Sequence, residues 1–179
     1  MKIYYVRHGQ TDWNLAKKMQ GGQTEKPLNE TGIEQAKETR KELENVKYDI
    51  IIHSPMYRAE QTAEIINQGR NVPTIVDERM RERNLGKLEG HDITEEMENT
   101  IWDYNLNYDI PEGENLHDFE KRILDFFKDI KQKYADKTVL IVAHGGVAKV
   151  IKAHLYGMPE SKNLSEIKMQ NCEIIEADI

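Results

Sequence analysis

The sequence predicts an α/β fold, specifically a three-layer α/β/α sandwich with a mostly parallel central sheet. Its apolar segments are short and nearly continuous, as in strands that are buried on both faces. Amphipathic helical patterns alternate with these segments, which is typical of a parallel sheet covered by helices. A length of 179 residues suits one domain with a full hydrophobic core.

Four apolar segments are predicted to be buried parallel strands, at residues 3–6, 50–52, 139–143 and 172–177. A short extended piece at residues 74–76 is a candidate for a fifth strand. Because the helical patterns separate these segments, we expect crossover connections between parallel neighbours rather than tight hairpins.

Three helices are predicted from periodicity and end signals. Thr31 and Glu34 have the spacing of a capping box, and they open a helix that runs to residue 46. Ser54 and Pro55 are expected to be the N-cap and first-turn proline of the next helix. The clearest helix covers residues 115–134, and one apolar stripe predicts its packing on the sheet: Leu116, Phe119, Ile123, Phe126, Phe127, Ile130 and Tyr134.

Residues 91–114 do not fit the alternation of strands and helices. We expect them to form a small excursion over the site within a single domain of residues 1–179. The excursion carries Trp102, Tyr104 and Tyr108. These aromatic side chains either line the mouth of a pocket or pack the excursion against the domain, and the sequence favours neither interpretation.

Composition excludes several classes of protein. Lys and Arg total 25 and Asp and Glu total 32, a formal net charge of −7 without a basic cluster, so no nucleic-acid partner is expected. No apolar run approaches the roughly 18 residues of a membrane-spanning helix, and the N-terminal stretch is too short for a signal peptide. The single cysteine, Cys172, allows no internal disulfide and favours a cytoplasmic location.

Cationic and titratable side chains follow three of the predicted strands. The stretch "VRHGQT" places Arg7 and His8 before a glycine, and the second strand is followed by "HSPMYR", which contains Arg58. The strand "TVLIVA" is followed by His144, two glycines and a predicted helix. Ligands of open parallel sheets bind beyond the carboxyl ends of the strands, so these groups predict a site for a small anion.

Five segments, in this order, resemble the histidine phosphatase superfamily, also called the phosphoglycerate mutase-like family: "RHGQTDWN", "SPMYRAEQTA", "RERNLGKLEG", "PEGENL" and "AHGGVAK". The resemblance implies hydrolysis of a phosphate monoester through a phosphohistidine formed on His8. It implies that Arg7 and Arg58 clamp the phosphoryl oxygens, and that His144 and Gly145 stabilise the transferring group. Asn14 matches a residue that helps to hold the phosphate, while Gln20 and Gly21 match a stretch on the substrate side.

The general acid is selected by the resemblance and not by spacing. "ERMRERNLGKLEG" contains Glu78, Glu82 and Glu89, any of which the pattern of residues would allow. The family places its acid just before the "NLGKLEG" stretch, which points to Glu82. The other histidines are interpreted as structural or solvent-facing: His53, His91, His117 and His154.

The sequence departs from the family pattern at several positions. Gln10 replaces a frequent glutamate and Glu25 a frequent aspartate, and one extra residue lies between Gly21 and Pro27. Lys149 stands where arginine is usual, which we interpret as a surface change or one behind the site. The excursion is short and lacks the extra basic residues of true phosphoglycerate mutases.

The sequence therefore predicts a cytoplasmic phosphomonoesterase of the histidine acid phosphatase-like type that needs neither metal nor cofactor. Its partner is a small phosphorylated metabolite, with no membrane involved. Sugar phosphates, phosphoserine, a cofactor-precursor nucleotide such as α-ribazole phosphate and a broad range of substrates are all compatible. The alternatives are a cofactor-dependent phosphoglycerate mutase, a metal-dependent hydrolase with His8, His144 and Glu82 as ligands, and a non-catalytic phosphate-binding module.

Overall fold

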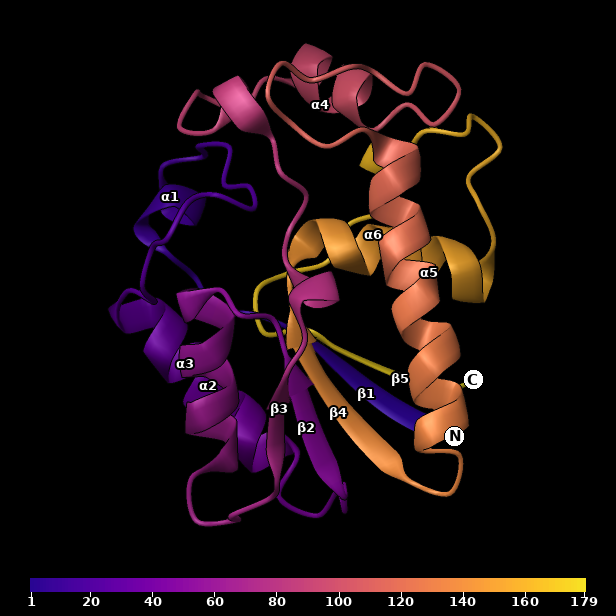
Figure 1. Ribbon diagram of the computed structural model, residues 1–179. Coiled ribbons are helices and arrows are strands. Elements are labelled where there is room, and N and C mark those ends of the chain that lie inside the picture. The colour runs from indigo at the N-terminus through magenta and orange to yellow at the C-terminus, as the bar shows by residue number, and fades with distance from the viewer.

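The computed structural model describes residues 1–179 and has a five-stranded sheet at its centre (Figure 1). The strand order is β3-β2-β4-β1-β5. Three of the four pairings are parallel, and only β1 with β5 is antiparallel. The strands are β1 (Lys2–Arg7), β2 (Ile50–His53), β3 (Thr74–Val76), β4 (Thr138–Ala143) and β5 (Ile174–Asp178).

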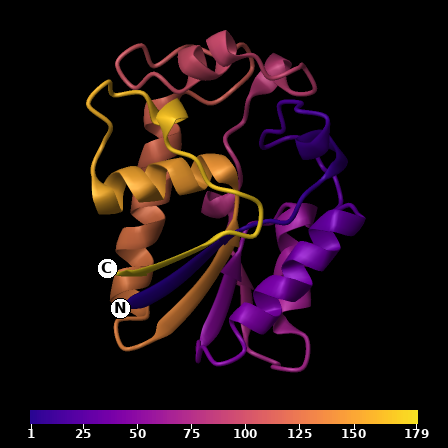
Figure 2. The same ribbon diagram turned by 180° about the vertical axis from the view of Figure 1, so that it is seen from behind.

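Helices cover both faces of the sheet, as the two opposite views show (Figures 1 and 2). On one side lie α2 (Glu30–Glu42) and α3 (Tyr57–Asn67), and on the other lie α5 (Leu116–Lys133) and α6 (Gly145–Tyr156). The predicted α/β sandwich with a mostly parallel sheet is confirmed by this arrangement.

Side chains of the central strands alternate between two apolar cores. In β4, Val139 and Ile141 belong to the core beneath α5 and α6, while Leu140 and Val142 belong to the core beneath α2 and α3. This alternation follows from the two-residue period of a strand, and it explains why the segment is apolar throughout. The stripe of α5 enters the larger core through Leu116, Phe119, Ile123, Phe126 and Ile130.

The last strand differs from the prediction in two respects. β5 begins at Ile174 instead of Cys172, and it runs antiparallel to β1. The chain leaves α6 and returns to the carboxyl end of the sheet, where the backbone N–H of Cys172 donates to the carbonyl of Arg7 at 2.9 Å. A strand that enters from that end must run opposite to β1.

The predicted helix starts are also corrected. Asn29, and not Thr31, caps α2, because its side chain accepts a hydrogen bond from the N–H of Gly32 at 2.9 Å. α2 ends at Glu42, so residues 43–46 lie outside it. α3 begins at Tyr57 after Met56, and the hydroxyl of Ser54 lies 2.7 Å from the ring of His144. The side chain of Ser54, which the sequence predicted as the N-cap of this helix, thus contacts His144 instead.

Loops and short helices gather beyond the carboxyl ends of the parallel strands (Figure 1). They include α1 (Asp12–Leu15), α4 (Glu95–Ile101) and the 3-10 turns Glu78–Met80, Gly86–Leu88 and Leu164–Glu166. α4 belongs to the excursion, which crosses the top of the molecule in Figure 1. None of the helices combines the length and the hydrophobicity that crossing a bilayer requires.

Candidate active site

His8 follows directly on β1 and is 2% exposed. Its Nδ1 lies 2.7 Å from the carbonyl oxygen of Gly9, and a carbonyl only accepts, so Nδ1 carries the proton and Nε2 a lone pair. The Nε of Arg58 donates to this Nε2 at 3.2 Å. Burial and the cations of Arg58 and Arg7 place the pKa of His8 well below its usual value. These hydrogen bonds define His8 as a neutral imidazole whose Nε2 lone pair accepts from Arg58.

Two arginines lie beside His8. Arg58, in the first turn of α3, is fully buried and donates to the carbonyls of Thr24 at 2.8 Å and Gly21 at 3.2 Å. Burial lowers its pKa to about 10, so it keeps its charge at pH 7. Arg7 ends β1, where its Nη1 donates to the carbonyl of Met169 at 2.5 Å and its Nε has no partner. No carboxylate pairs with either guanidinium, which leaves both charges available to an anion.

His144 follows β4, the neighbour of β1 in the sheet. Its ring centroid lies 5.3 Å from that of His8, at an interplanar angle of 61°. Its Nε2 lies 2.7 Å from the hydroxyl of Ser54, while Nδ1 is buried without a partner. Burial and the nearby Arg58, His8 and Arg7 hold the pKa of His144 well below its usual value. The structure thus brings together both imidazoles and both guanidinium groups that the sequence marked at three strand ends.

The structure separates the three candidate glutamates. Glu82 is 8% exposed, and its two carboxylate oxygens accept from the N–H of Arg83 and the N–H of Gly146, both at 2.8 Å. Gly146 lies in the first turn of α6, two residues after His144. Glu78 is exposed and pairs with Arg81, and Glu89 accepts from loop residues around Thr24. Only Glu82 lies against the helix that begins beside the two histidines.

A cavity of about 270 Å³ opens beside Arg7 and Glu82. Among the predicted residues, those lining it are Arg7, Asn14, Gln20, Glu82 and Gly145. His8, Arg58 and His144 are buried beside Arg7 and do not line the cavity, and Gly21 serves as an acceptor for Arg58. The predicted residues therefore form one region, with the imidazoles and Arg58 buried and the remaining polar groups facing the cavity.

Asn14 and Gln20 have unused hydrogen-bond donors. The side-chain oxygen of Asn14 accepts from the N–H of Thr11 at 3.1 Å and from the side-chain amide of Asn171 at 3.3 Å. The oxygen of Gln20 lies 2.7 Å from the hydroxyl of Thr11, and its buried Nε2 has no partner. Because the oxygens are engaged and an amide nitrogen only donates, both side chains offer N–H groups to an oxygen-rich ligand.

The aromatic residues of the excursion divide between the two expected roles. Trp102 lines the cavity and also packs edge-to-face on Phe119, with ring centroids 6.1 Å apart. Tyr104 instead donates to the Glu120 carboxylate at 2.8 Å, and Tyr108 packs against the larger core. Neither tyrosine lines the cavity. Of these three aromatic residues, only Trp102 lines the cavity.

The other histidines lie outside the cavity. His53 is buried with its Nδ1 2.8 Å from the carbonyl of Ser54, and His91, His117 and His154 are exposed. Lys149, expected at the surface or behind the site, is only 8% exposed, so a surface position is wrong. Its side chain reaches inward because three backbone carbonyls surround the ammonium group.

Sequence reasoning missed Asn171 and the structural role of Ser54. Asn171 donates to the carbonyl of His8 at 2.9 Å and to the side-chain oxygen of Asn14 at 3.3 Å. Its only sequence signal is its place in the stretch "QNCEI", just before the last strand. The position of Ser54 at a strand end could have suggested its contact with His144.

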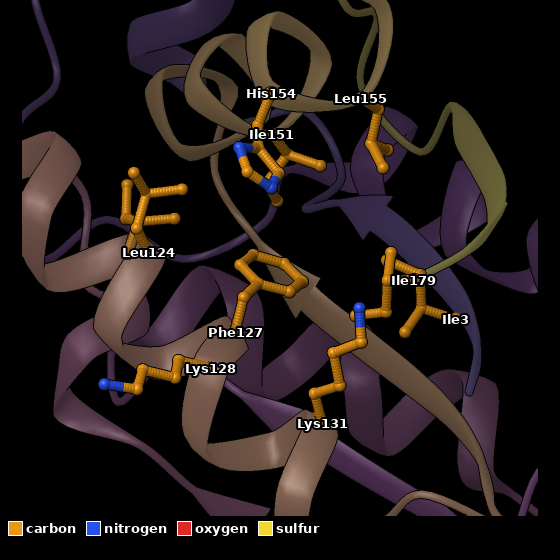
Figure 3. Close-up of a pocket in the computed structure, with 10 residues that line it drawn as sticks. Ile3, Leu124, Phe127, Lys128, Lys131, Ile151, His154, Leu155 and Ile179 are labelled. Carbon is orange, nitrogen blue, oxygen red and sulfur yellow. The ribbon is translucent and has the colours of Figure 1, made fainter.

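A second cavity, of about 290 Å³, lies between α5 and α6 and carries no comparable groups (Figure 3). Most of its lining is aliphatic or aromatic, for example Phe127 and Ile151, and no carboxylate contributes to it. Its cationic groups are Lys128, Lys131 and His154, and Lys128 extends away from the other side chains (Figure 3). The cavity in front of Arg7 is thus the one with groups suited to phosphate chemistry.

The sequence profile of the histidine phosphatase superfamily (branch 1) matches residues 3–179. The chain belongs to this superfamily, and the paired histidines and arginines occupy the carboxyl ends of its strands.

Individual relatives include both phosphatases and mutase-like proteins. The chain is 38% identical over 177 residues to the "uncharacterized phosphatase PhoE" of Bacillus subtilis (strain 168), covering 97% of this chain and 89% of that protein. It is 31% identical over 184 residues to the "probable phosphoglycerate mutase GpmB" of Escherichia coli O1:K1 / APEC, covering 99% and 85%. The solved structure of Bacillus stearothermophilus YhfR superimposes with a TM-score of 0.86 at 34% identity, covering 99% of this chain and 91% of that one. These relatives support a hydrolase of the phosphatase class.

Proposed function

We propose that this protein is a metal-independent phosphomonoesterase that hydrolyses a small phosphorylated metabolite through a phosphohistidine on His8. The observation that carries the proposal is the environment of the Nε2 of His8. This atom has a lone pair, and Arg58 lies 3.2 Å from it, with Arg7 and His144 beside it. A nucleophile among fixed cations and donors suits attack on a phosphate monoester.

In the first step, the phosphoryl group binds among the guanidinium groups of Arg7 and Arg58, the ring of His144 and the N–H groups of Asn14 and Gly145. The Nε2 of His8 attacks phosphorus as the bond from phosphorus to the ester oxygen breaks. Glu82, protonated at this stage, gives its proton to the departing oxygen. Gln20 and Gly21 lie on the substrate side, with Gly21 holding Arg58 through its carbonyl.

In the second step, a water molecule attacks the phosphohistidine, and the carboxylate of Glu82 accepts its proton. The bond from phosphorus to Nε2 breaks, and orthophosphate leaves. His8 returns to the neutral form, with the proton on Nδ1 hydrogen-bonded to the carbonyl of Gly9. One carboxylic group therefore serves as acid and then as base, and in its carboxylate form it accepts from the N–H groups of Arg83 and Gly146.

The similarity to GpmB favours phosphoglycerate mutase activity as the second candidate. Hydrolysis of p-nitrophenyl phosphate, measured against the interconversion of 2- and 3-phosphoglycerate, separates the two. Full hydrolysis in EDTA would contradict the metal-dependent alternative. A wild type that neither hydrolyses a panel of metabolite phosphates nor takes up label from a phosphodonor would favour the non-catalytic phosphate-binding module. We also propose a cytoplasmic location and a single domain of residues 1–179.

Replacing Glu82 by glutamine should slow substrates with poor leaving groups far more than p-nitrophenyl phosphate. Glutamine keeps the shape of the side chain but cannot give a proton to the leaving oxygen, and p-nitrophenolate leaves without one. The measurement compares kcat on an alkyl phosphate and on p-nitrophenyl phosphate, and a loss of about 10²- to 10⁴-fold is expected only on the former. Glu78→Gln, an exposed neighbour, serves as the matched control. Equal losses on both substrates would assign the acid to another residue.

Replacing Gly146 by alanine should reproduce much of the Glu82→Gln defect without removing the carboxylate. A Cβ at this position would overlap the carboxylate oxygen of Glu82 and lie 2.7 Å from the ring of Trp102. The displaced carboxylate would no longer reach the leaving oxygen, so the alkyl phosphate should again suffer more. The check is the ratio of kcat values on the two substrates, with thermal unfolding followed in parallel. An unchanged ratio would show that the position of Glu82 against α6 is unimportant.

A further inference from the structure

Lys149 is a buried cation that the proposed mechanism does not use. It lies on α6 and forms no ion pair, and its Nζ donates to three backbone carbonyls instead. These belong to Leu164 at 3.0 Å, Ser165 at 3.5 Å and Ile167 at 2.7 Å. An ammonium group has three donors, so the three acceptors match it in number. Burying a cation costs free energy, and these hydrogen bonds must offset that cost.

The carbonyls that surround Lys149 belong to a segment that reaches the active site. We call residues 164–172 the wall segment, because its residues 167–170 line the cavity in front of Arg7. Further along it, Asn171 donates to the carbonyl of His8 at 2.9 Å, and the N–H of Cys172 donates to the carbonyl of Arg7 at 2.9 Å. The wall segment therefore connects α6 to the end of β1.

The side chain of Arg7 depends on the wall segment for its orientation. Its one protein acceptor is the carbonyl of Met169, which lies 2.5 Å from Nη1, and no carboxylate holds it. The exposed part of the segment is also bound by Lys152, whose Nζ donates to the carbonyl of Lys168 at 2.7 Å. Lys149 makes the deeper contact, before the segment reaches Met169.

We propose that Lys149 is a positioning residue, which holds the wall segment against α6 so that Met169 and Asn171 orient Arg7 and His8 for phosphate binding. The proposal rests on the function proposed above. Trp102 supports the arrangement from the cavity side, since the Nζ of Lys149 lies 5.3 Å from the centre of its ring. Lys149 also lines this cavity, but its Nζ donates only to the three carbonyls of the wall segment and forms no hydrogen bond with His8 or Arg7.

The first test compares Lys149→Met, which keeps the length and loses the donors, with Lys149→Arg, which keeps a cation and donors. Lys149→Met should lower kcat/KM for p-nitrophenyl phosphate about tenfold and raise the inhibition constant of orthophosphate by a similar factor, the size expected from losing a charge-assisted hydrogen bond. Lys149→Arg should restore both values to within about threefold of the wild type, and Lys121→Met, at an exposed position of α5, should change neither. A folded Lys149→Met protein with wild-type constants would overturn the proposal, as would failure of Lys149→Arg to recover.

A second test needs neither turnover nor the methionine variant. Burial, the largest cause, lowers the pKa of Lys149 to about 8; the carboxylates of Glu98 and Glu82 favour the protonated form, and Lys168 and Arg7 oppose it. Raising the pH from 7 to 9 removes one of the three donors, whereas arginine keeps all of its own. Orthophosphate affinity, measured by calorimetry, should fall several-fold more in the wild type than in Lys149→Arg. Parallel pH profiles would overturn the proposal.

Amide hydrogen exchange distinguishes failure of this inference from failure of the proposed function. Faster exchange at Cys172 in Lys149→Met, with no change in β4, would show a loosened wall segment even in a protein without phosphatase activity. If turnover is absent in the wild type but exchange and orthophosphate affinity respond as expected, the positioning role holds and the hydrolytic function fails. Unchanged exchange at Cys172 would overturn the positioning role, whatever the activity.

Discussion

Replacing His8 by alanine is expected to abolish turnover and to prevent any uptake of acid-labile phosphate label. The Nε2 of His8 is the atom that would form the covalent bond to phosphorus, and no other side chain in the site can replace it. The hydroxyl of Ser54 lies in the site, but it is already hydrogen-bonded to His144. The loss should be on the order of 10⁶-fold in kcat, comparable to the removal of a protease nucleophile. Label incorporation and steady-state hydrolysis of p-nitrophenyl phosphate measure it.

His53 offers a closely matched control for the His8 variant. Both histidines follow or end a strand, are almost fully buried and have Nδ1 close to the carbonyl of the next residue, at 2.7 Å for His8 and 2.8 Å for His53. His53→Ala should therefore cost similar packing energy while keeping the label and most of the turnover. Residual labelling of His8→Ala, or loss of label in His53→Ala, would contradict the assignment of the nucleophile.

Replacing Arg58 by alanine is expected to lower kcat/KM by about 30- to 1000-fold, equivalent to about 2–4 kcal/mol of transition-state stabilisation. The guanidinium is fully buried, keeps its charge at pH 7 and has no carboxylate partner. Its Nε also donates to the nucleophilic ring, so the substitution removes both a phosphate contact and an interaction that orients His8. Steady-state kinetics on p-nitrophenyl phosphate, with orthophosphate inhibition, give the size of the effect.

Two further variants test whether the Arg58→Ala effect comes from the loss of a guanidinium at this particular position. Arg58→Lys keeps the charge but cannot bond two oxygens at once, and should recover only part of the loss. Arg40→Ala removes an arginine of α2 that binds the side chain of Gln68 away from the cavity, and should leave kcat/KM unchanged. A fall of less than about threefold for Arg58→Ala would exclude a direct contact with the transferring phosphoryl group.

The sequence predicted those residues of the site that lie at the carboxyl ends of parallel strands, where ligands of such sheets bind. Arg7, His8 and His144 follow strands that pair directly with one another, so their proximity could be expected from the sequence once the strands were assigned. Glu82 lies in a loop whose path the sequence does not define, and its contact with the N–H of Gly146 becomes visible only in the folded chain. The contacts of Asn171 and Lys149 were not predicted for the same reason, because their partners lie on distant segments.

The sequence by itself determined the α/β class, the strands of the sheet and the identity of the charged groups at their ends, because these depend on local periodicity and on the rule for parallel sheets. The tertiary structure decided the direction of β5, the start of α3 and which of the three glutamates lies against α6. Each of these is set by contacts between residues far apart in the chain, such as Cys172 with Arg7, Ser54 with His144 and Glu82 with Gly146. Local propensity carries no information about such contacts, since the energy that selects them appears only when the segments meet.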